Sequence, residues 1–324
     1  YGLISPQLSK KWLREISDED YIPSGFCIRN SFCKGMVFTF DFRRFAVEVA
    51  GNFTVRDIWG QERDVRDIDI VLTASMLKLW DSYNSLEHYL SCCEKNGYSF
   101  SVTMHTPAQL ENERNLNYQF IQSLYLDDAG IEELISPTVQ GIHDVLGLDY
   151  RKSILFLKGK DIDFKKEDND FIKAMMVDKR LINDPFVRSK IRNMIRKRID
   201  EAKVGVLKVR GNFSIISGDP YSLCQSIFGL KVTGLLQAGE FYSRYWNERG
   251  IDRVACFRAP MTCHNNIRVL NLKDMTEMQD WYRYMNTVTI FNSWDTAKHA
   301  LNGADCDGDS VLTTDNETIL GAIK

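Results

Sequence analysis

Runs of β-type composition occupy both ends of this chain, and longer amphipathic stretches with helical spacing occupy its middle. The N-terminal runs include residues 35–42 (GMVFTFDF) and 68–75 (IDIVLTAS), and the C-terminal runs include 286–292 (NTVTIFN). In residues 108–126 (AQLENERNLNYQFIQSLYL), apolar side chains recur at intervals of three and four, the period of an amphipathic helix. The pattern predicts an α+β protein with mostly β segments at 1–106 and 202–324 and a helical connector at 107–201.

The composition is that of a globular protein. Of the 324 residues, 44% are hydrophobic and 26% are charged, and no apolar run approaches the roughly 20 residues that span a membrane. The eight cysteines contain no Cys-x-x-Cys pair, which favours reduced thiols and a cytoplasmic location. The opening residues, YGLISPQLSKKWL, contain neither an initiator Met nor a signal peptide. We therefore expect a piece of a longer chain, truncated at both ends.

Three aspartates, Asp305, Asp307 and Asp309, lie within five residues in the segment ALNGADCDGDSVLTTDN (300–316). Carboxylates this close repel one another, and a hard divalent cation such as magnesium relieves the repulsion. Gly308 allows the backbone to turn tightly enough for the three side chains to converge. Magnesium on such a loop commonly contacts substrate phosphates, so the segment indicates phosphoryl transfer.

An acidic segment of this kind has two other interpretations. A calcium loop of the EF-hand type does not fit, because the glycine comes at the fourth position of the loop instead of the sixth, and Asn316 stands where a bidentate Glu is needed. A solvated acidic turn without a ligand is the simpler alternative for an Asp-Gly-Asp sequence.

Motifs at both ends of the chain resemble those of one polymerase family. NGADCDGD (302–309) resembles the Asn-Ala-Asp-x-Asp-Gly-Asp signature of the large catalytic subunit of cellular RNA polymerases, and FRAPMTCH (257–264) resembles the Arg-x-Pro element that precedes it, with one extra residue before His264. CIRNSFCKGMVFTFD (27–41) and DIDIVLTASMLKLW (67–80) resemble lysine-bearing segments of eukaryotic-type RNA-dependent RNA polymerases and related single-chain phage enzymes. The order of these motifs along the chain also resembles that of the two-barrel RNA polymerases, because the lysines precede a helical connector and the aspartates follow it.

The resemblance implies two double-psi β-barrels joined by a helical connector, with one active site between the barrels. Asp305, Asp307 and Asp309 would hold Mg²⁺, and Lys34 and Lys78 would contact phosphates of the incoming nucleotide and the primer end. Arg258, Pro260 and Arg29 would contact the substrate, and His264 and Asn266 are their neighbours. The implied reaction adds ribonucleotides from ribonucleoside triphosphates to the 3′ end of a nascent RNA, with an RNA template favoured over DNA.

A basic segment lies in the connector. Residues 188–203 (RSKIRNMIRKRIDEAK) indicate a helix whose cations could bind nucleic-acid phosphates, although a solvated helix face would show the same pattern. The candidate nucleic-acid contacts are Arg188, Lys190, Arg192 and Arg196. The net charge of −3 gives no basic signature for the chain as a whole. The aromatic residues Trp246, Trp281 and Tyr282 are expected in the core, because no interleaved aromatic and basic pattern marks a stacking surface.

Two functions remain as alternatives to polymerisation. A metal-dependent nuclease would use the acids without needing Arg258 or the two lysines. A non-catalytic double-psi module that binds metal would show affinity for the ion but no turnover.

Overall fold

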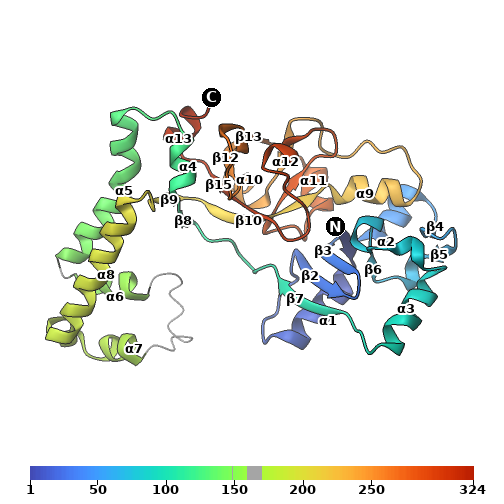
Figure 1. Ribbon diagram of the computed structural model, residues 1–324, viewed down its shortest axis with the longest axis horizontal. Helices are drawn as coiled ribbons and strands as arrows, with labels where there is room; N and C mark the ends of the chain where they lie inside the picture. The colour runs from blue at the N-terminus through green and yellow to red at the C-terminus, as the bar shows by residue number, and fades with distance from the viewer. Residues whose placement is uncertain (148, 159–169) are drawn as a thin grey trace. The chain divides into compact units, whose positions relative to one another are not determined.

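The chain divides into two compact units (Figure 1). This computed structural model describes residues 1–147, 149–158 and 170–324. The first unit contains residues 1–112 and 211–316, and the second contains 113–210 and 317–324. The α+β class is confirmed, since the first unit combines a sheet and a barrel with helices and the second unit is mostly helical. Among the described helices, none is long and apolar enough to cross a membrane.

The N-terminal part of the first unit is a five-stranded sheet in the order β6-β1-β3-β2-β7. Its strands are β1 (Gly2–Ile4), β2 (Gly25–Asn30), β3 (Cys33–Thr39), β6 (Ile70–Val71) and β7 (Ser101–His105), and its helices are α1 (Pro6–Ile16), α2 (Phe42–Phe45) and α3 (Leu86–Lys95). Strands β2 and β3 form an antiparallel hairpin in which Arg29 lies opposite Lys34.

This sheet is open, whereas the resemblance predicts a closed six-stranded barrel. The other two strands of the region, β4 (Thr54–Arg56) and β5 (Glu62–Asp64), pair with each other and form a separate hairpin. They therefore do not close the sheet.

The C-terminal part of the first unit is a closed barrel of six strands in the order β10-β14-β11-β13-β12-β15. Its strands are β10 (Asn212–Gly218), β11 (Glu240–Tyr242), β12 (Arg253–Phe257), β13 (Ile267–Leu272), β14 (Val288–Phe291) and β15 (Ser310–Thr314), and its helices are α9 (Pro220–Ile227), α10 (Arg244–Asn247), α11 (Thr276–Trp281) and α12 (Ala297–Ala300). Strand β15 runs antiparallel to both β10 and β12, so the segment just before β15 is held from two sides.

The sheet and the barrel share one hydrophobic core. The Phe40 ring stacks on Trp281 with a centroid distance of 5.8 Å, and the Phe45 ring meets Tyr221 edge-on at 5.1 Å. The prediction that Trp246, Trp281 and Tyr282 are core residues is confirmed, because all three are buried. Burial of several large rings makes this contact a strongly stabilising part of the unit.

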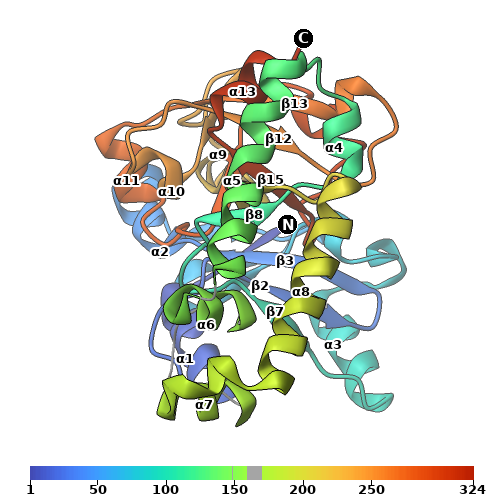
Figure 2. The same ribbon diagram turned by 90° about the vertical axis from the view of Figure 1, so that its left-hand side faces the viewer.

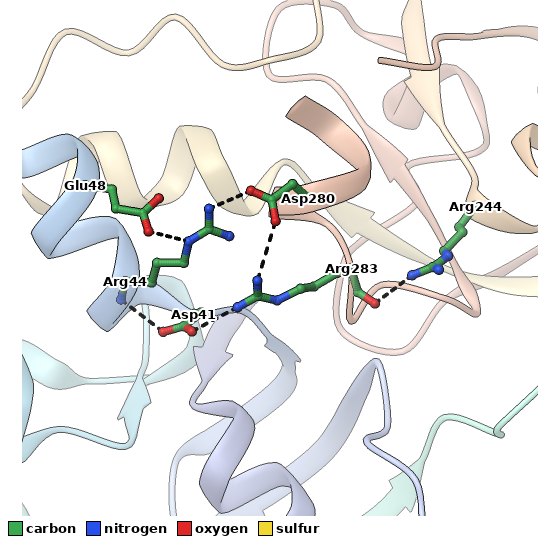
Figure 3. A network of polar contacts seen from close by, with 6 residues as sticks. All are labelled: Asp41, Arg44, Glu48, Arg244, Asp280 and Arg283. Atoms are coloured by element: carbon green, nitrogen blue, oxygen red, sulfur yellow. Dashed lines mark hydrogen bonds and ion pairs between the residues drawn. The ribbon is translucent and has the colours of Figure 1, made fainter. Parts of the chain in front are cut away.

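A network of ion pairs joins the same two parts (Figure 3). Arg44 of α2 bonds Glu48 at 2.7 Å and Asp280 of α11 at 2.6 Å. Arg283 bonds Asp41 at 3.3 Å, and its backbone carbonyl accepts a hydrogen bond from Arg244. The hydrogen bonds from Arg44 lower the pKa of both Glu48 and Asp280. The network therefore stabilises the fold only where these carboxyls are ionised.

We expect Arg44→Met to lower the melting temperature at neutral pH and to have a smaller effect in acid. Carboxyls with lowered pKa values contribute stability above the pKa of the unfolded chain, about 4, and that contribution is lost as pH falls. Thermal melts of wild type and variant between about pH 7 and pH 2 measure the difference. Arg56→Met, at an exposed pair with Glu62, is the control and should change little. A difference that persists unchanged in acid would assign the effect to packing of Arg44 on Trp281.

The second unit is built around α5 (Asp128–Leu146) and α8 (Pro185–Lys203), which run side by side in both views (Figures 1 and 2). Its other elements are β8 (Glu113–Asn115), α4 (Tyr118–Gln122), α6 (Tyr150–Lys158), α7 (Asp170–Val177), a 3₁₀ turn at Lys179–Asn183, β9 (Lys208–Arg210) and α13 (Glu317–Gly321). Helix α8 begins at an Asp184 cap followed by Pro185, and it buries Val187, Ile191 and Ile195. Because these buried residues are spaced four apart on one face of α8, the basic residues of the helix lie on its other faces.

Candidate active site

Within the acidic segment, residues 305–309 form a turn directly before β15. The carbonyl of Asp309 accepts a hydrogen bond from the Ile216 amide of β10 at 2.9 Å, and the Asp305 amide donates to the Asp309 carboxylate at 2.8 Å. Gly308 has φ +124, in the region that favours glycine, and a side chain there would meet nothing within 4 Å. The backbone conformation, and not crowding, is what demands glycine at this position.

Lys34 of β3 contacts this turn. Its ammonium lies 2.9 Å from Asp307 Oδ2, with the two side chains 53% and 34% exposed. The hydrogen bond from Lys34, and to a smaller extent the charge of Arg29, lowers the pKa of Asp307. Asp307 is therefore ionised at neutral pH, and the pair remains accessible to solvent.

Arg258, the residue directly after β12, also contacts the turn. Its guanidinium lies 2.8 Å from Asp309 Oδ2 and donates to the carbonyls of Leu301 and Asn302 at 3.2 and 2.9 Å. The side chains of Arg258 and Asp309 are only 17% and 27% exposed. Asn302 in turn donates to the Pro260 carbonyl, so the FRAP segment and the acidic turn are tied together.

We expect Arg258→Ala to lower the free energy of unfolding by about 2 kcal/mol, because a largely buried carboxylate and two carbonyls lose their donor. A thermal melt measures this effect. An unchanged melting temperature would contradict this anchoring role.

Lys78 lies elsewhere on the same unit. Its amide donates to the Phe32 carbonyl in the β2–β3 loop at 2.6 Å, and its side chain is exposed. Within the described part of the chain, Lys78 forms no ion pair with the acidic turn. Of the two lysines predicted to contact phosphates, only Lys34 is brought to the aspartates.

The chemistry of the turn fits a divalent metal ion. It offers three carboxylates, of which Asp307 is ionised, beside the open space at Gly308. In residues 1–147, 149–158 and 170–324, however, no three His, Cys, Asp or Glu side chains are grouped closely enough to hold a metal. Lys34 and Arg258 occupy oxygens of Asp307 and Asp309 instead.

Other polar residues support the turn and were not singled out for this role by the sequence. Asn266 donates to the Ala300 carbonyl at 2.7 Å, and Lys298 donates to the Cys306 sulfur at 3.7 Å. The Cys27 thiol of β2 approaches the Asp307 carbonyl at 4.0 Å. Three of these supporting residues lie within or beside the acidic motif, so their closeness in sequence could have indicated their role: Asn302, Lys298 and Cys306. No feature of the sequence indicated a role for Cys27.

The basic residues of α8 belong to the second unit. Lys190, Arg192 and Arg196 are exposed, and Arg188 donates to Asn183 at 2.7 Å. Their role as nucleic-acid contacts stays a prediction.

Comparisons with known proteins agree with these motifs. A family model described as RNA dependent RNA polymerase matches residues 1–323. The DNA-directed RNA polymerase YonO of Bacillus phage SPbeta is 27% identical, over 100% of this chain and 36% of the relative. The RNA dependent RNA polymerase QDE-1 from Thielavia terrestris has a similar structure, with a TM-score of 0.63 at 13% identity over 100% of this chain and 34% of that one.

The chain thus spans about a third of the length of these two relatives. At 13% identity the likeness to QDE-1 shows a shared fold. The family match covers nearly the whole chain and confirms the family indicated by the acidic motif and the lysine segments. The chain belongs to the RNA dependent RNA polymerase family.

Proposed function

We propose that this chain is the catalytic core of an RNA polymerase that adds ribonucleotides to the 3′ end of an RNA. The observation that carries the proposal is the pair between Lys34 and Asp307, 273 residues apart in sequence. It joins a lysine of the N-terminal sheet to the acidic turn of the barrel, as a site formed by two β parts requires. The family match supports the same reaction class.

The proposed architecture has a first double-psi β-barrel at 1–106, a helical connector at 107–201 and a second double-psi β-barrel at 202–324. The closed six-stranded barrel and the likeness to QDE-1 support the second barrel. The N-terminal sheet is open, so the first barrel is proposed from the resemblance alone. Part of the connector, residues 148 and 159–169, lies outside the described residues.

Each site residue has a proposed role in this reaction. Asp305, Asp307 and Asp309 would hold Mg²⁺, which when bound supplies polarisation of the phosphoryl oxygens and a lower pKa for the attacking hydroxyl. Lys34 would move from Asp307 to a phosphate of the incoming nucleotide, which neutralises developing charge and frees the carboxylate. Lys78 would contact phosphates from beside the β2–β3 loop, and Arg258, Pro260 and Arg29 would position the nucleotide.

Primer extension by the protein, with ribonucleoside triphosphates and magnesium on RNA and DNA templates, tests the proposal. We expect primers to lengthen by ribonucleotides. An RNA template is favoured by the family match, and a DNA template by the name of the phage relative, so both are needed. Primers that shorten would indicate a nuclease instead, and metal binding without any turnover would indicate a non-catalytic module.

The basic face of α8 is proposed to bind the nucleic-acid backbone. Replacing both Arg192 and Arg196 with Ala should weaken RNA binding and reduce the slope of log affinity against log salt by about 1.5, because two phosphate contacts are lost. Titrations at several salt concentrations measure the slope. Replacing Arg180, an exposed residue paired with Asp178, provides a control, and an unchanged slope in the double variant would contradict the role.

A further inference from the structure

Two large apolar residues beside the lysines are exposed and held in an unusual backbone conformation. Phe32, in the loop between β2 and β3, is 52% exposed, and Leu79, next to Lys78, is 55% exposed. Both have φ of +57. This left-handed region is rare for large side chains, because the Cβ atom crowds the following carbonyl.

A short turn between two paired strands does not require a large aromatic residue such as Phe32 at a positive φ. Ser31 and Phe32 form the two-residue loop between the paired residues Asn30 and Cys33. At a positive φ in such a loop, Gly or Asn is the usual residue, since neither incurs the full steric penalty. A bulky aromatic side chain at this position costs folding stability and gains little burial, which points to a role for the exposed ring.

The surrounding structure holds this loop firmly in place. The Ser31 carbonyl accepts a hydrogen bond from the Tyr89 hydroxyl at 2.8 Å, and the Phe32 carbonyl accepts one from the Lys78 amide at 2.6 Å. Beneath the loop, Cys33 pairs with Leu77 in a buried cluster that includes Tyr89. The Phe32 backbone is therefore fixed before any ligand arrives, and Lys78 and Leu79 are fixed beside it.

Three cations come from the segments that hold this loop. Lys34 lies two residues after Phe32, Arg29 lies opposite Lys34 across the hairpin, and Lys78 is hydrogen-bonded to the loop itself. An exposed aromatic face among cations suits a ligand that is aromatic and anionic at once. A single-stranded nucleic acid has this chemistry, because its bases stack on aromatic rings while its phosphates contact Lys and Arg.

We propose that Phe32 is a stacking contact for a base of single-stranded RNA entering or leaving the active site, with Leu79 as the apolar side of the same contact. This inference rests on the proposed function and extends it, because it adds a base contact to a site so far described only by acids and cations. A phosphate beside the stacked base would contact Lys78. The contact is tolerant of sequence, since every base has a π face.

The test measures binding of a fluorescently labelled eight-nucleotide oligoadenylate to the protein and to three variants at position 32. Phe32→Asn, which suits the left-handed backbone, and Phe32→Leu, which keeps the apolar volume without a π face, should each weaken binding about tenfold. Phe32→Trp should bind as the wild type does. The melting temperature of Phe32→Asn should equal or exceed that of the wild type, because the substitution relieves strain.

The salt dependence separates stacking from charge. The Phe32 variants should keep the wild-type slope of log affinity against log salt, whereas Lys78→Ala should reduce it by about 0.7. Wild-type affinity in Phe32→Asn would overturn the proposal and leave the exposed pair as a contact for another protein. Wild-type affinity in Phe32→Leu would also overturn it, because the contact would then be apolar without stacking.

Failure of this inference is distinguishable from failure of the proposed function. A protein that extends primers while its Phe32 variants bind the oligonucleotide normally lacks only the stacking contact. A protein that neither binds the oligonucleotide nor extends primers lacks the polymerase function as well.

Discussion

Asp307→Asn should slow nucleotide addition about a thousandfold, the scale on which loss of a single preorganised electrostatic group acts in enzymes. Asp307 is the carboxylate that Lys34 contacts, and the lowered pKa keeps it ionised at neutral pH. Asn keeps the size of the side chain but removes the negative charge, so both metal binding and the contact with Lys34 are weakened. The melting temperature should change little, because an ion pair this exposed contributes at most about 1 kcal/mol.

Single-turnover primer extension measures the rate, and Asp20→Asn is the matched control. Asp20 is also an exposed aspartate, paired with Arg14 at 3.1 Å, so the same chemical change there should leave the rate unchanged. A rate for Asp307→Asn within a few-fold of wild type would end the assignment of this turn as the metal site.

Lys34→Ala should lower the rate of nucleotide addition about a hundredfold while the affinity for template falls much less. Lys34 comes from the N-terminal sheet and contacts the acidic turn directly, so its ammonium is placed to neutralise charge that develops on the transferred phosphoryl group. A contact made mainly in the transition state affects the rate and not ground-state binding.

Rates and template affinities measured on the same preparations separate these effects, with Lys11→Ala as the control at an exposed pair with Glu15. Lys34→Arg keeps the charge and should recover part of the rate. A loss of template affinity as large as the loss of rate, relieved at low salt, would instead make Lys34 a general backbone contact.

The sequence predicted the parts of this site that are encoded over short distances. The acidic turn and the FRAP segment each span only a few residues, so their letters alone indicated the family and singled out the aspartates and Arg258 as candidates. The α+β class also followed from the local spacing of apolar residues. That spacing is two residues in the predicted strands and three to four residues in the predicted helices.

Relations between distant residues could not be obtained in this way. No periodicity indicates that Lys34 and not Lys78 contacts the aspartates, because that depends on how the hairpin packs against the barrel. The sequence also gave no sign that β4 and β5 pair with each other instead of closing the N-terminal sheet. The Phe32 ring was missed for a similar reason, since a positive φ is a property of the folded loop.

The division of the first unit into residues 1–112 and 211–316 has a consequence for synthesis of the chain. At translation rates of at most about 20 residues per second, Asp307 is made no sooner than about 14 s after Lys34. At the same rate, Phe45 lacks Tyr221 for at least about 9 s and Phe40 lacks Trp281 for at least about 12 s, and these are the rings that cover them. The nascent N-terminal sheet therefore exposes aromatic surface on the ribosome for many seconds, and we expect chaperones that bind apolar segments to associate with it during that interval.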